Sequence, residues 1–336
     1  MDSTKRGGVL EVTDLRPVFL FSLPRSGSTL LQRMLGTHSQ ISTVSEPWIL
    51  LPYLHSLRRS GTYSEYWHRN MVGAIDDLCD ALPNGREDYL CEVRELALRL
   101  YAKAAQPGVR YFLDKTPRYN LIVEDVMNLF PDGRFVVLWR NPLAVVASVL
   151  ETFSGGHWMT HLHKVDLFEG LERLLDAYAR RSGEFASVRY EDLVSEPAAE
   201  AGRVVAHLGL DWEAGVIEDF AQGRLQGRVG DQTGIRQYVQ VSQVPLDKWK
   251  RTLASPVRKL WCRRYLSWIG GERLALMGYD LDLLRAELDE VPTQLSSLAP
   301  DVVQTARGVV WSVAEPRILR DKLARLPRWH RIYSHY

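Results

Sequence analysis

The sequence has few cysteines and no long hydrophobic run. Its 336 residues include only Cys79, Cys91 and Cys262, an odd number without metal-ligand spacing. This excludes a disulfide framework, argues against a zinc site and fits a reducing compartment. No run of about 18 apolar residues occurs, so we expect no membrane span. The segment Met1 to Val18 mixes charges of both signs, unlike a signal peptide, and we therefore expect a cytoplasmic protein.

The sequence also lacks an excess of charge of either sign. It has 42 Lys and Arg residues against 41 Asp and Glu residues, so we expect no nucleic-acid partner. The exception is residues 317–331, where six basic residues face one acidic residue and alternate with apolar ones. We predict a basic helix there. It is either a solvated face or a contact with an anionic membrane surface or a lipid-linked acceptor.

Short apolar runs alternate along the chain with segments of helical periodicity. These runs lie at residues 19–21, 41–44, 111–113, 135–139 and 185–188. Their alternation with helices predicts an α/β fold with a central parallel sheet flanked by helices and with helical additions. We expect an N-terminal tail, a main domain and a C-terminal extension over residues 1–16, 17–285 and 286–336. The polar, glycine-rich stretch 223–245 is expected to be a long loop.

One turn carries the strongest indication of function, Leu23-Pro24-Arg25-Ser26-Gly27-Ser28-Thr29. Since it joins an expected strand to an expected helix, its backbone N–H groups and the helix N-terminus suit a phosphate. Its hydroxyl groups add donors, and Arg25 adds a charged contact. An ordinary turn is the alternative. The spacing Gly-x4-Gly-Lys-Ser/Thr of nucleotide-hydrolysing loops is absent, which weakens a kinase or ATPase.

The string Pro24 to Leu31 resembles the 5′-phosphosulfate loop of sulfotransferases that use 3′-phosphoadenosine 5′-phosphosulfate (PAPS). The resemblance implies a P-loop NTPase-like fold for the chain from about residue 17 to residue 212. It also implies that Arg25 serves catalysis as well as binding. The residues implied to hold the 5′-phosphosulfate are Arg25, Ser26, Gly27, Ser28 and Thr29.

Two later segments match the same family in the same order. The run 135–139 ends in Arg140, and Ser148 follows eight residues later; the family uses such a pair to hold the donor's 3′-phosphate. The run 185–188 leads to Tyr190, which resembles a tyrosine that borders the adenine. Taken alone, these residues would be a surface cation, a packing residue and a structural tyrosine. The Arg-Lys-Gly triplet that completes the 3′-phosphate site in cytosolic members is missing, with Arg236 and Lys248 as candidates.

The resemblance also implies where the reacting groups lie. Sulfuryl transfer needs a base for the acceptor proton and a cation for the leaving phosphate. Lys115, in the family's Lys-Thr segment, is the expected cation, with a solvated loop lysine as the alternative. The His that follows this segment in cytosolic members is absent. The chain therefore looks closer to the branch that includes protein-tyrosine sulfotransferases, where a Glu is the base.

Glu46 is the expected base because it follows the apolar run 41–44, and ligands collect at strand ends in such sheets. A solvated loop residue or a cap is the alternative. His157, His161 and His163 form a competing set. Of these, we expect His157 to line the acceptor pocket or act as the base; a metal pair of His157 and His161 would lack further ligands. Trp48 could line an apolar acceptor site or pack in the core.

We therefore expect a sulfotransferase that moves a sulfuryl group from PAPS to a hydroxyl or amine and releases adenosine 3′,5′-bisphosphate (PAP). No metal is expected. The acceptor is a small molecule, a glycan or a lipid that the donor site does not identify. One alternative is a kinase or other phosphotransferase on the same fold, and a second is a nucleotide-binding scaffold without catalysis. A homodimer remains open.

Overall fold

The computed structural model describes residues 15–59, 62, 68–220 and 246–314. At its centre lies a parallel sheet of five strands in the order β2-β3-β1-β4-β5. The strands are β1 (Arg16–Ser22), β2 (Ile41–Thr43), β3 (Tyr111–Asp114), β4 (Arg134–Trp139) and β5 (Phe185–Arg189). Each apolar run found in the sequence overlaps one of these strands. The predicted α/β fold with a central parallel sheet flanked by helices is therefore confirmed.

Helices fill the connections between the strands and follow the last one. Up to β4 they are α1 (Ser28–Leu35), α2 (Leu50–His55), α3 (His68–Ala81), α4 (Arg86–Ala104), η1 (Pro117–Leu121) and α5 (Val123–Leu129). Between β4 and β5 they are α6 (Pro142–Ser154), η2 (Thr160–His163), the π-helix η3 (Val165–Gly170), α7 (Leu171–Arg181) and η4 (Ser182–Glu184). After β5 they are α8 (Tyr190–Ser195), α9 (Pro197–His207), α10 (Gly215–Glu218), α12 (Lys248–Thr252), α13 (Pro256–Ile269), α14 (Gly271–Leu276), α15 (Leu281–Glu290) and α16 (Leu298–Ala314).

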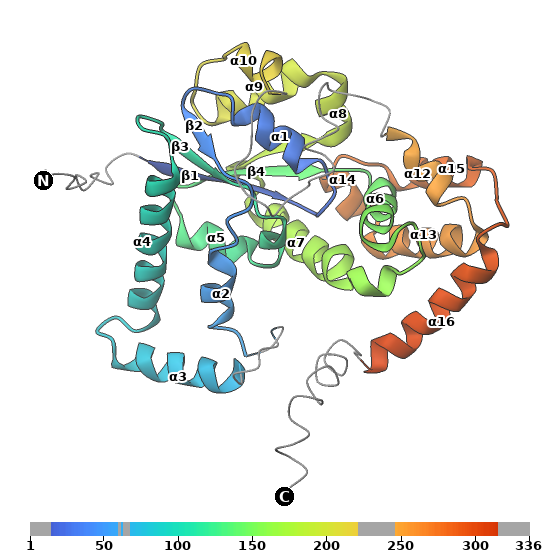
Figure 1. The fold of residues 1–336 in the computed structure, drawn as a ribbon, viewed down its shortest axis with the longest axis horizontal. Coiled ribbons are helices and arrows are strands. Elements are labelled where there is room, and N and C mark those ends of the chain that lie inside the picture. The colour runs from blue at the N-terminus through green and yellow to red at the C-terminus, as the bar shows by residue number, and fades with distance from the viewer. Residues whose placement is uncertain (1–14, 60–61, 63–67, 221–245, 315–336) are drawn as a thin grey trace, which may run out of the picture.

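Each face of the sheet is covered by an apolar layer. Along β1, Phe19 and Phe21 belong to one layer, and Val18 and Leu20 belong to the other, as the alternation of side chains in a strand requires. Helices α5 and α7 lie on the first face, and α1 and α9 lie on the second (Figure 1). Because both faces are buried, the strands appear in the sequence as unbroken apolar runs.

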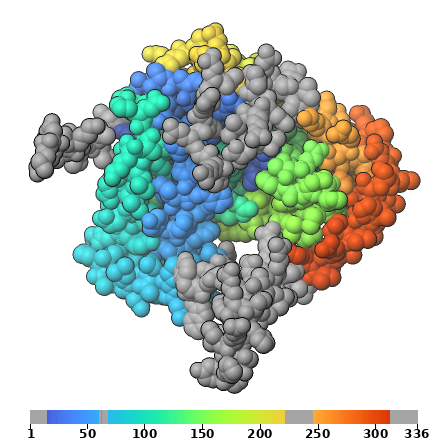
Figure 2. Space-filling view, viewed as in Figure 1, coloured from blue at the N-terminus to red at the C-terminus, as the bar shows by residue number. Residues whose placement is uncertain are grey.

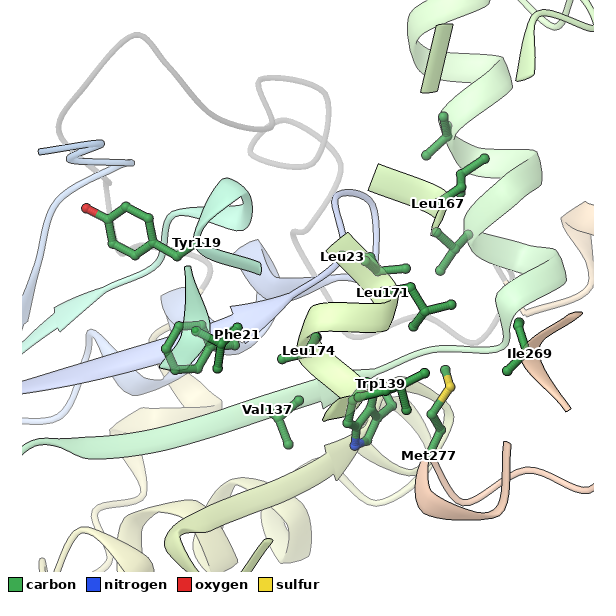
Figure 3. Packing of buried hydrophobic residues seen from close by; sticks show 14 of the residues in the cluster. Phe21, Leu23, Tyr119, Val137, Trp139, Leu167, Leu171, Leu174, Ile269 and Met277 are labelled. Carbon is green, nitrogen blue, oxygen red and sulfur yellow. The ribbon is translucent and has the colours of Figure 1, made fainter. Parts of the chain in front are cut away.

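The C-terminal helices join the same core as the sheet. In Figure 3, Leu171 and Leu174 of α7 lie near Val137 and Trp139 of β4, and Met277, directly after α14, lies beside the Trp139 ring. Figure 2 shows α3 and α4 at one side of the molecule and the helices from α12 to α16 at the other. Among the described residues, no helix has the length and apolarity needed to cross a bilayer.

A buried ion pair fastens α16 to α13. Arg258 donates from Nε and Nη2 to the two carboxylate oxygens of Asp301, each at 2.8 Å. The side chains of Arg258 and Asp301 are 9% and 1% exposed. Arg258 also donates to the backbone carbonyls of Thr252 and Gly156. The pair therefore links α16, α12 and the loop after α6.

The division of the chain into three parts stays a prediction. The expected limit between residues 285 and 286 falls within α15, and the buried pair ties α16 to the preceding helices. The predicted basic helix over 317–331 lies outside the described residues. So does the predicted loop over 223–245, which includes Arg236.

Replacing Asp301 with Ala should destabilise the protein by about 3–5 kcal/mol, because it leaves the Arg258 charge buried without its anion. Urea unfolding of Asp301→Ala and the parent measures this difference. The matched control is Asp289→Ala, which removes an exposed pair with Arg263 and should cost less than about 1 kcal/mol. An equal loss of unfolding free energy in the two variants would contradict a special stabilising role for the buried pair of Arg258 and Asp301.

Candidate active site

A predicted site residue follows each of the five strands, at the same edge of the sheet. The loop 23–27 follows β1, and Glu46 lies three residues after β2. Lys115, Arg140 and Tyr190 come directly after β3, β4 and β5. Because the strands are parallel, their carboxyl ends lie together, and this is the edge where α/β proteins bind ligands. Residues up to 167 positions apart in the sequence therefore share one site, since the loop begins at 23 and the last residue is 190.

The loop after β1 turns sharply into α1. Gly27 has φ 93° and precedes the first residue of the helix, Ser28. A Cβ atom on Gly27 would lie 2.3 Å from the Tyr190 ring, so only glycine fits here. Arg25 also has a positive φ, 70°. This turn directs the N-terminus of α1, with its unpaired N–H groups, toward the shared edge of the sheet.

Arg25, Arg140, Ser148 and Tyr190 lie together, as the sequence predicts. Arg25 Nε donates to Ser148 Oγ at 3.3 Å, and Arg140 Nη1 donates to the Arg25 carbonyl at 2.8 Å. The Arg140 guanidinium stacks on the Tyr190 ring, 4.4 Å from its centroid. Arg25 of the loop thus lies in one cluster with a second positive charge, a hydroxyl and an aromatic ring from three other segments. Their separate contacts with a donor stay predictions.

A buried ion pair lies on the other side of the loop. Lys115 Nζ donates to Glu46 Oε1 at 2.7 Å and to Thr29 Oγ1 at 3.4 Å. The side chains of Lys115 and Glu46 are 2% and 8% exposed. The alternative that Lys115 and Glu46 are solvated loop residues is therefore wrong. A buried lysine needs such a partner, because an unpaired charge is costly to remove from water.

Gln32, which sequence reasoning missed, and Trp48, which it considered only for the acceptor site or the core, hold the Glu46 segment in place. Gln32 of α1 donates from Nε2 to the carbonyls of Val44 and Ser45, at 2.7 and 3.0 Å. Trp48 Nε1 donates to the second carboxylate oxygen of Glu46, Oε2, at 3.0 Å. The sequence carries no sign of this role, because Ser28, Thr29 and Arg33 on the same helix are polar too. The burial of Gln32, and with it the need for buried partners, appears only in the structure.

Sequence reasoning also missed Asp114, which supports the segments that contain Lys115, Thr116 and Trp48 through a chain of hydrogen bonds. It is 1% exposed and accepts hydrogen bonds from Tyr101 Oη at 2.6 Å and Thr116 Oγ1 at 2.8 Å. Thr116 Oγ1 in turn accepts from the backbone N–H of Trp48 at 3.3 Å. Burial raises the pKa of Asp114 to about 6, although its hydrogen bonds oppose that shift.

The histidine set lies beyond the end of α6. His157 is exposed, His163 bonds the Ser154 hydroxyl at 3.0 Å, and the His161 ring lies 5.6 Å from that of Trp311. Within the part of the chain that the structure describes, no group of three His, Cys, Asp or Glu side chains is arranged for a metal. Lys248, the other predicted candidate for the 3′-phosphate, is exposed on α12.

A parallel sheet with a tight loop between its first strand and first helix, flanked by two arginines and a lysine, defines a phosphate-binding α/β protein. The comparison with known families narrows this class. The chain belongs to the sulfotransferase family, whose model matches residues 17–214. The family predicted from the loop and its later partners is thereby confirmed.

Individual relatives agree with this assignment. Nodulation protein NoeE of Sinorhizobium fredii is 33% identical over 226 residues, which cover 59% of this chain and 51% of that protein. Protein-tyrosine sulfotransferase 2 of Gallus gallus is 23% identical over 283 residues, covering 78% and 69%. This chain thus spans about half the length of NoeE. The sulfotransferase domain of an olefin synthase from Synechococcus PCC 7002 has a similar fold, with a TM-score of 0.50 and 22% identity over 70% of this chain and 88% of that one.

The buried carboxyl of Asp114 should make stability depend on pH. Its pKa rises from 3.8 to about 6 on folding, so its contribution is complete below pH 3.8 and is lost as the pH rises through 6. The shift corresponds to about 3 kcal/mol. Relative to Asp114→Asn, the parent should gain up to that amount between pH 7 and pH 4, measured by urea unfolding. A difference that stays constant over this range would contradict the role of Asp114.

Proposed function

We propose that this protein is a sulfotransferase that moves a sulfuryl group from PAPS to a hydroxyl or amine of its acceptor. One observation carries the proposal beyond family membership. Lys115 Nζ lies 2.7 Å from Glu46 Oε1 and 3.4 Å from Thr29 Oγ1. A cation, a carboxylate base and the phosphate loop therefore form one hydrogen-bonded cluster, which is the set of groups that sulfuryl transfer requires.

The donor would lie along the edge of the sheet. The loop from Arg25 to Thr29 would hold its 5′-phosphosulfate with N–H groups and hydroxyls, while the Arg25 guanidinium adds charge. Arg140 and Ser148 would hold the 3′-phosphate, and Tyr190 would border the adenine. The contacts of Arg140 with Arg25 and Tyr190 support this arrangement, because they bring the two phosphate sites within the reach of one nucleotide.

The transfer itself is an in-line displacement at sulfur. The acceptor oxygen or nitrogen forms the new bond to sulfur while its proton passes to Glu46. The bond between sulfur and the bridging oxygen breaks, and its electron pair remains on the phosphate of the departing PAP. Lys115 and Arg25 offset the charge that develops there. As in phosphoryl transfer, positioning and electrostatics supply most of the rate.

The proposal also covers the acceptor, the location in the cell and the basic stretch near the C-terminus. His157 would line the acceptor pocket, and the acceptor is a small molecule, a glycan or a lipid. The three cysteines, which form no disulfide, fit a cytoplasmic location. The basic stretch 317–331 would be either a solvated face or a contact with an anionic lipid surface or a lipid-linked acceptor. Family membership disfavours a kinase on the same fold.

Calorimetry with PAP and with magnesium and ATP tests the donor. We expect PAP to bind more tightly, because Arg140 and Ser148 are placed for a 3′-phosphate that ATP lacks. Arg140→Ala should weaken PAP binding by about 10- to 100-fold, the value of a charged hydrogen bond. The control Arg99→Ala changes an exposed arginine on α4 and should bind as the parent does. Tighter binding of ATP would overturn the assignment.

Turnover tests the roles of Lys115 and Glu46. The assay uses radiolabelled PAPS with phenol, sugar and amine acceptors, and donor hydrolysis by water where none accepts. Lys115→Ala should lower kcat by about 10²- to 10³-fold, since the leaving group loses its cation. Glu46→Gln should lower it by about 10²- to 10⁴-fold, since the proton has no base. Exposed counterparts, Lys103→Ala and Glu87→Gln, serve as controls. Full activity of Glu46→Gln would place the base elsewhere, with His157 next.

A further inference from the structure

We propose that Trp48 is a positioning residue that fixes the carboxylate of Glu46 for catalysis once Lys115 has turned to the donor. The inference rests on the proposed function, because it concerns the base of that reaction. In the structure both carboxylate oxygens of Glu46 accept a hydrogen bond. Lys115 Nζ donates to Oε1 at 2.7 Å, and Trp48 Nε1 donates to Oε2 at 3.0 Å.

These two donors cannot keep the same roles during turnover. Lys115 must approach the bridging oxygen of PAPS as charge develops there, and this takes part of its interaction away from Glu46. Without a second donor, a Glu side chain with its three rotatable bonds would sample several orientations. The indole N–H supplies that donor. It is neutral, so it orients the carboxylate without cancelling the charge that attracts the acceptor proton.

The backbone around Trp48 is built to hold the indole there. Trp48 has φ 59°, and among the described residues only Arg25 shares a positive φ outside glycine. Such a conformation is unfavourable for a bulky residue and persists only where surrounding contacts impose it. Here the backbone N–H of Trp48 donates to Thr116 Oγ1, and the Thr116 hydroxyl in turn donates to the buried carboxylate of Asp114. Pro47 further restricts Glu46 to extended conformations.

Core packing does not account for this residue. Trp48 is 39% exposed, so the apolar burial that normally fixes a tryptophan is incomplete. What fixes it is the hydrogen bond to Glu46 at one end and the backbone contact at the other. A strained, exposed tryptophan beside a catalytic carboxylate is therefore best explained by its effect on that carboxylate.

A double-mutant cycle tests the inference, with Trp48→Phe keeping an aromatic ring but losing the N–H donor. In the parent, Trp48→Phe should lower kcat by about 10- to 100-fold, the usual cost of a misplaced catalytic group. The KM for PAPS and the melting temperature should not change. In the Glu46→Gln background the same substitution should change kcat by less than about twofold, because the base it positions is already gone. Trp212→Phe, at another exposed tryptophan, should leave kcat unchanged in both backgrounds.

Two results would overturn the positioning role. One is a parental kcat in Trp48→Phe. The other is the same fold-loss in both backgrounds, which would make Trp48 an acceptor wall or a structural residue. Failure of the proposed function has a different outcome, because the parent would then turn over no PAPS, or Glu46→Gln alone would retain the parental kcat.

Discussion

The charge of Lys115 is removed from water, and the geometry of the site follows from how that charge is balanced. An isolated ammonium group inside a protein costs several kcal/mol, yet this side chain is 2% exposed. Glu46 supplies the balancing charge from a strand end 69 residues away in the sequence, and Thr29 adds a hydroxyl from the start of α1. One ion pair thus draws together the ends of β2 and β3 and the phosphate loop, and the supporting bonds from Gln32 and Trp48 hold the carboxylate where this pairing needs it.

Strain is concentrated where the site needs it. Arg25 and Trp48 adopt left-handed backbone conformations, which cost roughly 1–2 kcal/mol each for residues with side chains. Each is held by a contact from another segment, Arg25 by Arg140 and Trp48 by Thr116. Both conformations therefore depend on contacts between the strand ends of the folded sheet.

Sequence alone predicted the sheet and the main charges because both leave local signals. Strands buried on both faces appear as apolar runs, and the order of Arg25, Lys115 and Arg140 along the chain indicated the family. The residues that support the site leave no such signal. Asp114 and Trp48 matter through bonds between distant segments, and their neighbours in sequence do not reveal those bonds. Helix α15 also crosses the expected domain limit between residues 285 and 286, since the sequence does not show which helices pack together.

The central claim is that the pair of Lys115 and Glu46 is the resting arrangement of a donor site. A crystal structure with PAP bound tests it most directly. The account predicts the 5′-phosphate on the backbone N–H groups from Ser26 to Thr29, with Lys115 Nζ in contact with that phosphate and no longer bonded to Glu46 Oε1. A 5′-phosphate bound away from this loop, or a Lys115 still held by Glu46 with the phosphate out of its reach, would contradict the account.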